Sequence, residues 1–168
     1  MGGSLTRSRI ECAVAGAFAG AVATWFMGMA TEYLYEHEDK SARQREDDAR
    51  GGKTAYGVAA EKVADFAGIS LSDAERKKTG AGIHWALGVA AGAAYGLATR
   101  NDTSFSPLRG LGFGTLFWAT MDETVTPLLG LTPGPKAFPL ETHARGLAGH
   151  AVFGATADAA LSVINRAL

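Results

Sequence analysis

The stretch that decides the fold is Thr79–Thr99, TGAGIHWALGVAAGAAYGLAT, in which His84 is the one titratable residue apart from tyrosine. A helix of ~20 apolar residues matches the ~30 Å hydrocarbon core of a bilayer. The stretch Cys12–Thr31 has nearly the same length and contains no charged residue. Both stretches therefore predict helices that cross a membrane.

Two further stretches of this length carry titratable groups: Gly110–Leu131 with Asp122 and Glu123, and Gly146–Ile164 with His150 and Asp158. The sequence therefore predicts an all-α protein, an integral membrane helical bundle with about four transmembrane helices in a single domain, residues 1–168. Two other interpretations remain open. One is a soluble all-helical protein with buried Ala/Gly-rich helices, and the other is a cleaved signal peptide at the first stretch.

The charge and the cysteine content exclude some classes of protein. The net charge is −1, so nothing in the composition indicates a nucleic-acid partner. The single cysteine, Cys12, forms no intrachain disulfide. The charged residues are concentrated outside the apolar stretches, which makes the lipid bilayer the expected partner of those stretches.

Glycines recur at every fourth position of the apolar stretches: Gly16 and Gly20, then Gly88, Gly92 and Gly96, then Gly110 and Gly114. In lipid, such glycines let helix backbones approach closely. In water, each glycine weakens a helix by ~1 kcal/mol relative to alanine. The pattern favours the membrane interpretation and predicts tight helix packing, either within one chain or in a homo-oligomer or with another membrane protein.

The connection between the first two stretches, residues 36–71, is charged and then amphipathic. HEDKSARQREDDARGGK predicts a solvated helix that ends at Gly51–Gly52. An amphipathic helix follows, with its apolar residues at helical spacing: Tyr56, Ala59, Ala60, Val63, Phe66 and Ala67. It either lies on the membrane surface or caps the bundle.

Local signals set the remaining helix boundaries. Ser72 and Glu75 form a capping box, so a helix is expected to begin near Asp73. Pro127 is expected to kink the third membrane stretch. The prolines of Thr132–Pro139 should keep that segment non-helical, so the last helix is expected to begin near Glu141.

Adjacent carboxylates inside a membrane stretch need a compensating interaction. An ionised carboxylate at a helix centre costs ~2.5–3.5 kcal/mol, whereas each Leu, Phe or Val returns only ~0.3–0.6 kcal/mol. We therefore predict a buried His/carboxylate site formed by His84, Asp122, Glu123 and His150. Such groups either bind a cation, with a divalent transition metal as the candidate cofactor, or handle protons. Secondary polar candidates are His143, Arg145 and Asp158.

Each of these residues also has a structural interpretation. His84 is equally compatible with a hydrogen-bonded core residue, and Glu123 with a position facing the membrane interface. Asp158 has Arg166 as a possible partner, and His143 and Arg145 are compatible with headgroup-level positions. The spacing matches no specific metal motif, and no nucleophile–base pair or cofactor fingerprint supports an enzyme. Haem ligation by His84 and His150 is a further alternative.

The C-terminal half contains a set of short motifs: His84 followed by Tyr95-Gly96, Gly110-Leu111-Gly112, PLLGLTP at residues 127–133, and Gly149-His150. In these motifs it resembles the YagU-like family of bacterial inner-membrane proteins. The resemblance covers roughly residues 82–160 and implies a multi-pass inner-membrane protein of unknown biochemical activity. The family pattern has a histidine where this chain has Asp122 and a glutamate where it has Gly146, which puts a metal site carried over from the family in doubt.

Two hypotheses about function follow. The first is a small inner-membrane protein whose buried His/carboxylate site binds a cation or handles protons. The second is a structural or oligomerising membrane subunit that packs through its glycine faces and has no chemistry of its own. The distribution of Lys and Arg gives conflicting indications of orientation in the membrane.

Overall fold

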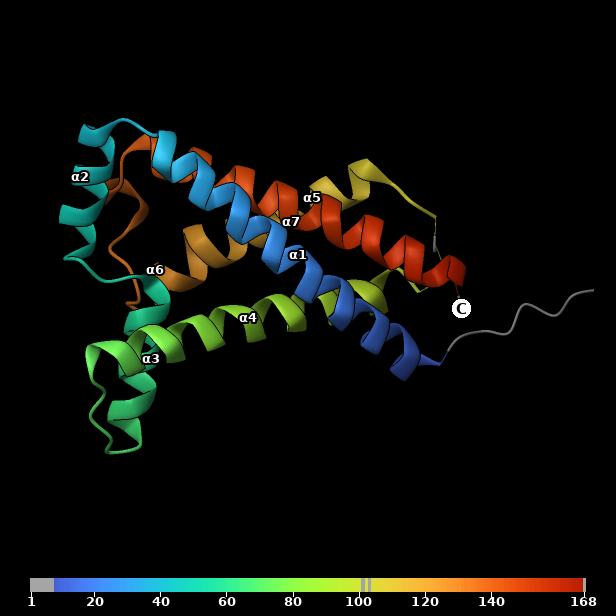
Figure 1. Ribbon diagram of the computed structural model, residues 1–168, viewed down its shortest axis with the longest axis horizontal. Helices are drawn as coiled ribbons and strands as arrows, with labels where there is room; N and C mark the ends of the chain where they lie inside the picture. Colours follow the sequence, from blue (N-terminus) through green and yellow to red (C-terminus); the bar gives the residue numbers. More distant parts are fainter. Residues whose placement is uncertain (1–7, 101, 103, 168) are drawn as a thin grey trace, which may run out of the picture.

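The computed structural model describes residues 8–100, 102 and 104–167, and these residues form helices and connecting segments (Figure 1). In chain order the elements are α1 (Arg9–His37), α2 (Lys40–Arg50), α3 (Ala55–Phe66), α4 (Asp73–Ala98), α5 (Pro107–Thr120), a π-helical turn (Met121–Val125), α6 (Thr126–Leu128), a 3-10 turn (Pro135–Ala137) and α7 (Leu140–Ala167). The predicted all-α class is confirmed for the described residues.

The helices α1, α4 and α7 are long and apolar enough to cross a membrane. Their outer faces expose large apolar side chains, for example Phe18 and Trp25 of α1 and Val163 of α7. Extensive apolar exposure of this kind suits contact with lipid rather than water. The chain is therefore a helical membrane protein.

The third of the four predicted spans, Gly110–Leu131, is not confirmed as a membrane span. The α-helix α5 ends at Thr120, the π turn follows, and α6 ends at Leu128. In the π turn the amide of Thr126 bonds to the carbonyl of Met121, one residue further back than in an α-helix. Pro127 has no amide hydrogen to donate, so the helix is interrupted close to the predicted kink.

Several predicted boundaries agree with the structure. Helix α4 begins at Asp73 behind the predicted capping box of Ser72 and Glu75. Helix α7 begins at Leu140, one residue before the expected position. One expectation differs from the structure. The segment 132–139 was expected to be wholly non-helical, but it contains a 3-10 turn.

Helices α1 and α4 cross at their glycines, within one chain. A Cβ added to Gly20 would lie 2.5 Å from the carbonyl oxygen of Gly88 and 2.9 Å from Cα of Gly92. Gly16 is in the same close contact with Gly92 and Gly96. Only glycine allows two backbones to approach this closely, so these residues fix the crossing point.

Helices α5 and α7 meet through a second set of glycines. A Cβ on Gly110 would lie 2.7 Å from the carbonyl oxygen of Gly154, and one on Gly114 would collide with the backbone of His150. This contact places the π turn that follows α5 directly against the first half of α7. The core between the helices is small and apolar, with alanines of α1 packed against Tyr95, Phe153, Ala157 and Leu161.

The short helices α2 and α3 lie at one end of the bundle, together with the start of α7 (Figure 1). The apolar face predicted for α3 is only partly buried: Ala60 is buried, whereas Val63 and Phe66 are exposed. Glu61 joins α3 to the start of α4 through Arg76, at 3.0 Å. Hydrogen bonds from Lys53 and Arg76 hold the pKa of Glu61 below its usual range.

Candidate functional site

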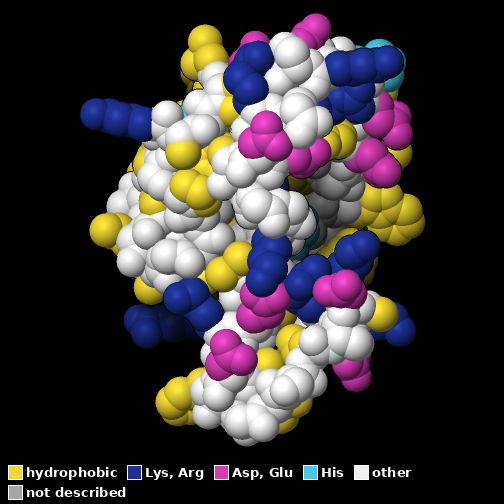
Figure 2. Space-filling view, turned by 90° about the vertical axis from the view of Figure 1, so that its left-hand side faces the viewer, with side chains coloured by type: hydrophobic (Ala, Val, Ile, Leu, Met, Phe, Trp, Pro, Cys, Tyr) yellow, Lys and Arg dark blue, Asp and Glu magenta, His cyan; other side chains and the backbone are white. Residues whose placement is uncertain are grey.

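A cavity of about 510 Å³ opens at the end of the bundle that carries α2 and α3. Charged side chains of both signs surround a hollow on this face (Figure 2). The walls come from α1, α2, α4, the π turn and α7, and the segment 132–138 closes one side. Cavities of ~300–1,000 Å³ are typical of small-molecule sites.

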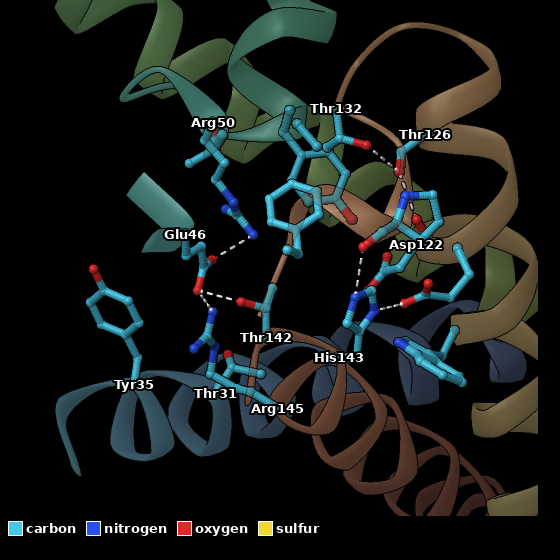
Figure 3. A pocket seen from close by; sticks show the side chains of 18 of the residues that line it. Thr31, Tyr35, Glu46, Arg50, Asp122, Thr126, Thr132, Thr142, His143 and Arg145 are labelled. Carbon is cyan, nitrogen blue, oxygen red and sulfur yellow. Dashed lines mark hydrogen bonds and ion pairs between the residues drawn. The ribbon is translucent and has the colours of Figure 1, made fainter. Parts of the chain in front are cut away.

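Glu123 and His143 form the outer of two carboxylate–imidazole pairs in the cavity (Figure 3). Oε1 of Glu123 lies 2.6 Å from Nδ1 of His143. The other ring nitrogen of His143, Nε2, lies 3.0 Å from the carbonyl oxygen of Pro135. Both ring nitrogens of His143 therefore face oxygen atoms, and the side chains of the pair are 22% and 23% exposed.

Asp122 and His150 form the deeper pair. Oδ2 of Asp122 lies 3.7 Å from Nδ1 of His150, which is only 2% exposed. The same Nδ1 donates a hydrogen bond of 3.0 Å to the carbonyl oxygen of Gly146. Both carboxylates of the π turn therefore face histidines of α7.

Gly146 makes room for this deeper pair. A Cβ at this position would lie 3.3 Å from Oδ2 of Asp122 and 3.0 Å from Nε1 of Trp118. The indole Nε1 is buried and has no hydrogen-bond partner among the described residues. Positions 122 and 146 are therefore neighbours in space.

His84 lines the same cavity but pairs with neither carboxylate. Its ring stacks on Tyr56 of α3 with 4.8 Å between the ring centroids. Burial raises the pKa of the Tyr56 hydroxyl above its ordinary value, and the charge of Asp122 raises it further. The four predicted site residues thus border one cavity without converging on one point.

The cavity entrance is closed on one side by α2, which is held by ion pairs. Arg145 of α7 bonds to Glu38 and to Glu46, and Glu46 is 2% exposed. Glu46 also accepts a hydrogen bond of 3.0 Å from Thr142 and pairs with Arg50 at 2.7 Å (Figure 3). Arg145 and Glu46 are 99 residues apart. Arg145 is therefore a structural tie between α2 and α7.

We predict that Arg145→Gln loosens α2 from the bundle. The substitution leaves the carboxylates of Glu38 and Glu46 without their guanidinium, at a cost of about 2 kcal/mol. Opening of α2 should rise roughly 30-fold, measured as faster amide hydrogen exchange over residues 40–50. Arg45→Gln is the matched control, because Arg45 is 55% exposed and lies 3.8 Å from Glu141. Equal exchange in the two variants would contradict the assignment.

Asp158 lies away from the cavity, at the opposite end of the bundle. It is 1% exposed and accepts hydrogen bonds from the Tyr95 hydroxyl at 2.5 Å, from the Ser106 amide at 2.7 Å and from Nη2 of Arg109 at 2.7 Å. The suggested pairing with Arg166 is therefore wrong. These bonds tie α4, α5 and α7 together, so Asp158 is a packing residue.

Sequence reasoning missed several residues of the site: Met27, Glu38, Glu46, Arg50, Tyr56, Trp118 and Thr142. For Glu46 the sequence contains one local signal: Glu46 stands four residues after Ala42, on the same face of the helix. These two are the buried residues of α2.

In the part of the chain that the structure describes, no group of three or more His, Cys, Asp or Glu residues is arranged to hold a metal ion. The metal cofactor stays a prediction.

Comparisons with curated proteins and with solved structures gave no match. A family model does match, and it covers α3, α4, α5, the π turn and most of α7, which include both carboxylate–imidazole pairs and the glycine contacts of α5 with α7. The match extends over residues 55–159, which is more than half of the chain. The chain therefore belongs to the family described as proteins of unknown function, DUF1440.

Proposed function

We propose that this membrane protein reversibly binds a proton in its cavity, on the pair formed by Glu123 and His143. The observation that carries the proposal is the position of His143 between two oxygen atoms, Oε1 of Glu123 and the carbonyl oxygen of Pro135. The proposed role is proton handling at one face of the membrane.

The hydrogen-bond geometry supports a shared proton on the pair. A carbonyl oxygen only accepts, so Nε2 of His143 carries a hydrogen that it donates to Pro135. A neutral imidazole with its hydrogen on Nε2 has no hydrogen on Nδ1. Nδ1 would then lie 2.6 Å from an ionised carboxylate oxygen, and these two acceptors would repel each other. The pair therefore consists either of an imidazolium with a carboxylate or of an imidazole with a carboxylic acid.

The surroundings support exchange of this proton from one side. The pair lines the wide cavity, where Asp122, His150 and Arg50 are among the other charged or titratable groups. Further along the bundle, the rings of Phe113, Phe117 and Phe153 pack against one another. Because these rings offer no polar atom to carry a proton, the arrangement favours binding and release at one face over conduction through the bundle.

Nitrogen NMR of histidine-labelled protein in detergent tests the proposal. At neutral pH we expect His143 to be protonated on both ring nitrogens, or to accept a hydrogen from a protonated Glu123. Glu123→Gln should leave a neutral imidazole with one hydrogen, and titration should show one proton fewer per chain than in wild type. Glu141→Gln, whose carboxylate is 46% exposed, is the control. A neutral His143 beside an ionised Glu123 would overturn the proposal.

The other predicted features remain proposals of different weight. The likeness to the YagU-like family is consistent with the family match and supports an inner-membrane location. A structural or oligomerising role has less support, because Gly88, Gly92 and Gly96 contact α1 of the same chain. An oligomer would have to use other surfaces, and the mass of the detergent-solubilised protein tests for it.

A further inference from the structure

A second, much smaller cavity adjoins the first and is lined by residues of α1, α3, α4, α5 and α7. Its volume is about 10 Å³, close to the lower limit for one water molecule. Met27 of α1, Tyr56 of α3, His84 of α4 and His150 of α7 line both cavities. The small cavity, which we call the inner chamber, therefore adjoins the large one.

The inner chamber is lined by polar atoms that lack partners. Nδ1 of His150 donates to Gly146, so Nε2 is the ring nitrogen that carries a free lone pair. No hydrogen bond from the described residues reaches this Nε2, either ring nitrogen of His84 or the hydroxyl of Tyr56. The side chain of His150 is only 3% exposed. His84 and Tyr56 are half-buried, and their polar atoms and Nε2 of His150 are available to a small guest in the chamber.

The donors of the inner chamber have a distinct chemistry. They include imidazole nitrogens of His84 and His150 and the thioether sulfur of Met27, beside the hydroxyls of Thr24 and Tyr56. No carboxylate lines the chamber, since Asp122 and Glu123 belong to the large cavity. Thioether sulfur combined with imidazole favours Cu⁺ over hard divalent cations, which prefer oxygen ligands. The bond from Nδ1 of His150 to a backbone carbonyl is the usual way in which a metal-binding histidine is oriented.

We propose that the inner chamber binds one Cu⁺ ion through Nε2 of His150, a ring nitrogen of His84 and Sδ of Met27. The ion enters and leaves as Cu⁺ by way of the large cavity, without a redox step. Tyr56 stacks on His84 and fixes the orientation of its ring. The assignment does not depend on the proton-binding pair, because neither Glu123 nor His143 lines the chamber.

Anaerobic titration of the detergent-purified full chain with Cu⁺, against a chromogenic Cu⁺ chelator, tests the proposal. Every variant carries Cys12→Ser, which removes the one thiol of the chain. The protein with Met27 intact should retain one Cu⁺ per chain. Met27→Leu should weaken Cu⁺ binding by more than about tenfold, because loss of a residue that only hydrogen-bonds to a metal ligand already has an effect of that size. Met29→Leu, on the same helix and 55% exposed, is the matched control and should bind normally.

X-ray absorption spectroscopy of the loaded protein provides the second readout. We expect sulfur and imidazole scattering around the copper, with the sulfur contribution lost in Met27→Leu and kept in Met29→Leu. His84→Asn and His150→Asn should each abolish retention of the ion. Loss of Cu⁺ to the chelator by the protein with Met27 intact, equal binding by the two methionine variants, or retention of Zn²⁺ in place of Cu⁺ would each overturn the proposal.

Discussion

Replacing Asp158 by alanine should lower the free energy of unfolding by about 3–5 kcal/mol, the cost of breaking a buried ion pair by removing one partner. The carboxylate is 1% exposed and is the common acceptor of Tyr95, Ser106 and Arg109. Without it, the Arg109 guanidinium keeps Asp102 as its one charged partner among the described residues. Chemical unfolding of the protein in detergent, followed by circular dichroism, measures the loss.

Asp102→Asn is the control for this prediction. Asp102 also bonds to Arg109, at 2.7 Å, but its side chain is 63% exposed. Exposed ion pairs contribute little because water and salt screen them, so this variant should unfold almost like wild type. If Asp158→Ala unfolded at the same denaturant concentration as Asp102→Asn, the buried cluster would not be a tie between helices.

Gly92→Val should be the second strongly destabilising change, with a loss of at least about 3 kcal/mol, the upper part of the range for overpacked cores. A Cβ at position 92 would lie 2.5 Å from Cα and 2.7 Å from the amide nitrogen of Gly20. Both atoms belong to the backbone of α1 and have no rotamer that relieves the clash. Helices α1 and α4 must then separate along their whole contact. Chemical unfolding measures the loss.

Gly82→Ala, on the same helix, distinguishes contact from helix propensity. An added Cβ at position 82 meets nothing within 4 Å. This variant should be neutral or stabilised by up to about 1 kcal/mol, the difference in helix propensity between glycine and alanine. Equal destabilisation by the two substitutions would mean that glycine content, and not the contact of α1 with α4, limits stability.

The sequence predicts the features that depend on neighbours along the chain. The long apolar stretches became α1, α4 and α7, and the capping box of Ser72 and Glu75 set the first residue of α4. Helix length and end-capping are decided within one or two turns, which a sequence displays directly. Pro127 likewise indicated an interruption in the third stretch, although the type of interruption, a π turn, was not predicted.

The partners of the polar residues could not be predicted in this way. Asp158 meets Arg109 from 49 residues away, and Glu46 meets Arg145 from 99 residues away. Such pairs depend on how the helices cross, and the crossing depends on backbone contacts of Gly16 and Gly20 with α4. The predicted set of His84, Asp122, Glu123 and His150 lines one cavity, but only Asp122 and His150 form a pair, and the partner of Glu123 is His143.

The crossing of α1 and α4 also has a mechanical consequence. Their contact lies toward the end of the bundle opposite the cavity (Figure 1). The part of α1 beyond Gly20 is a lever arm that reaches His37, about 25 Å long at 1.5 Å per residue. A rotation of about 10° at the fulcrum would move its far end by about 4 Å. The volume around the histidines is therefore sensitive to the crossing angle, and the contacts of Met27 and Thr31 with Gly149 of α7 hold that angle.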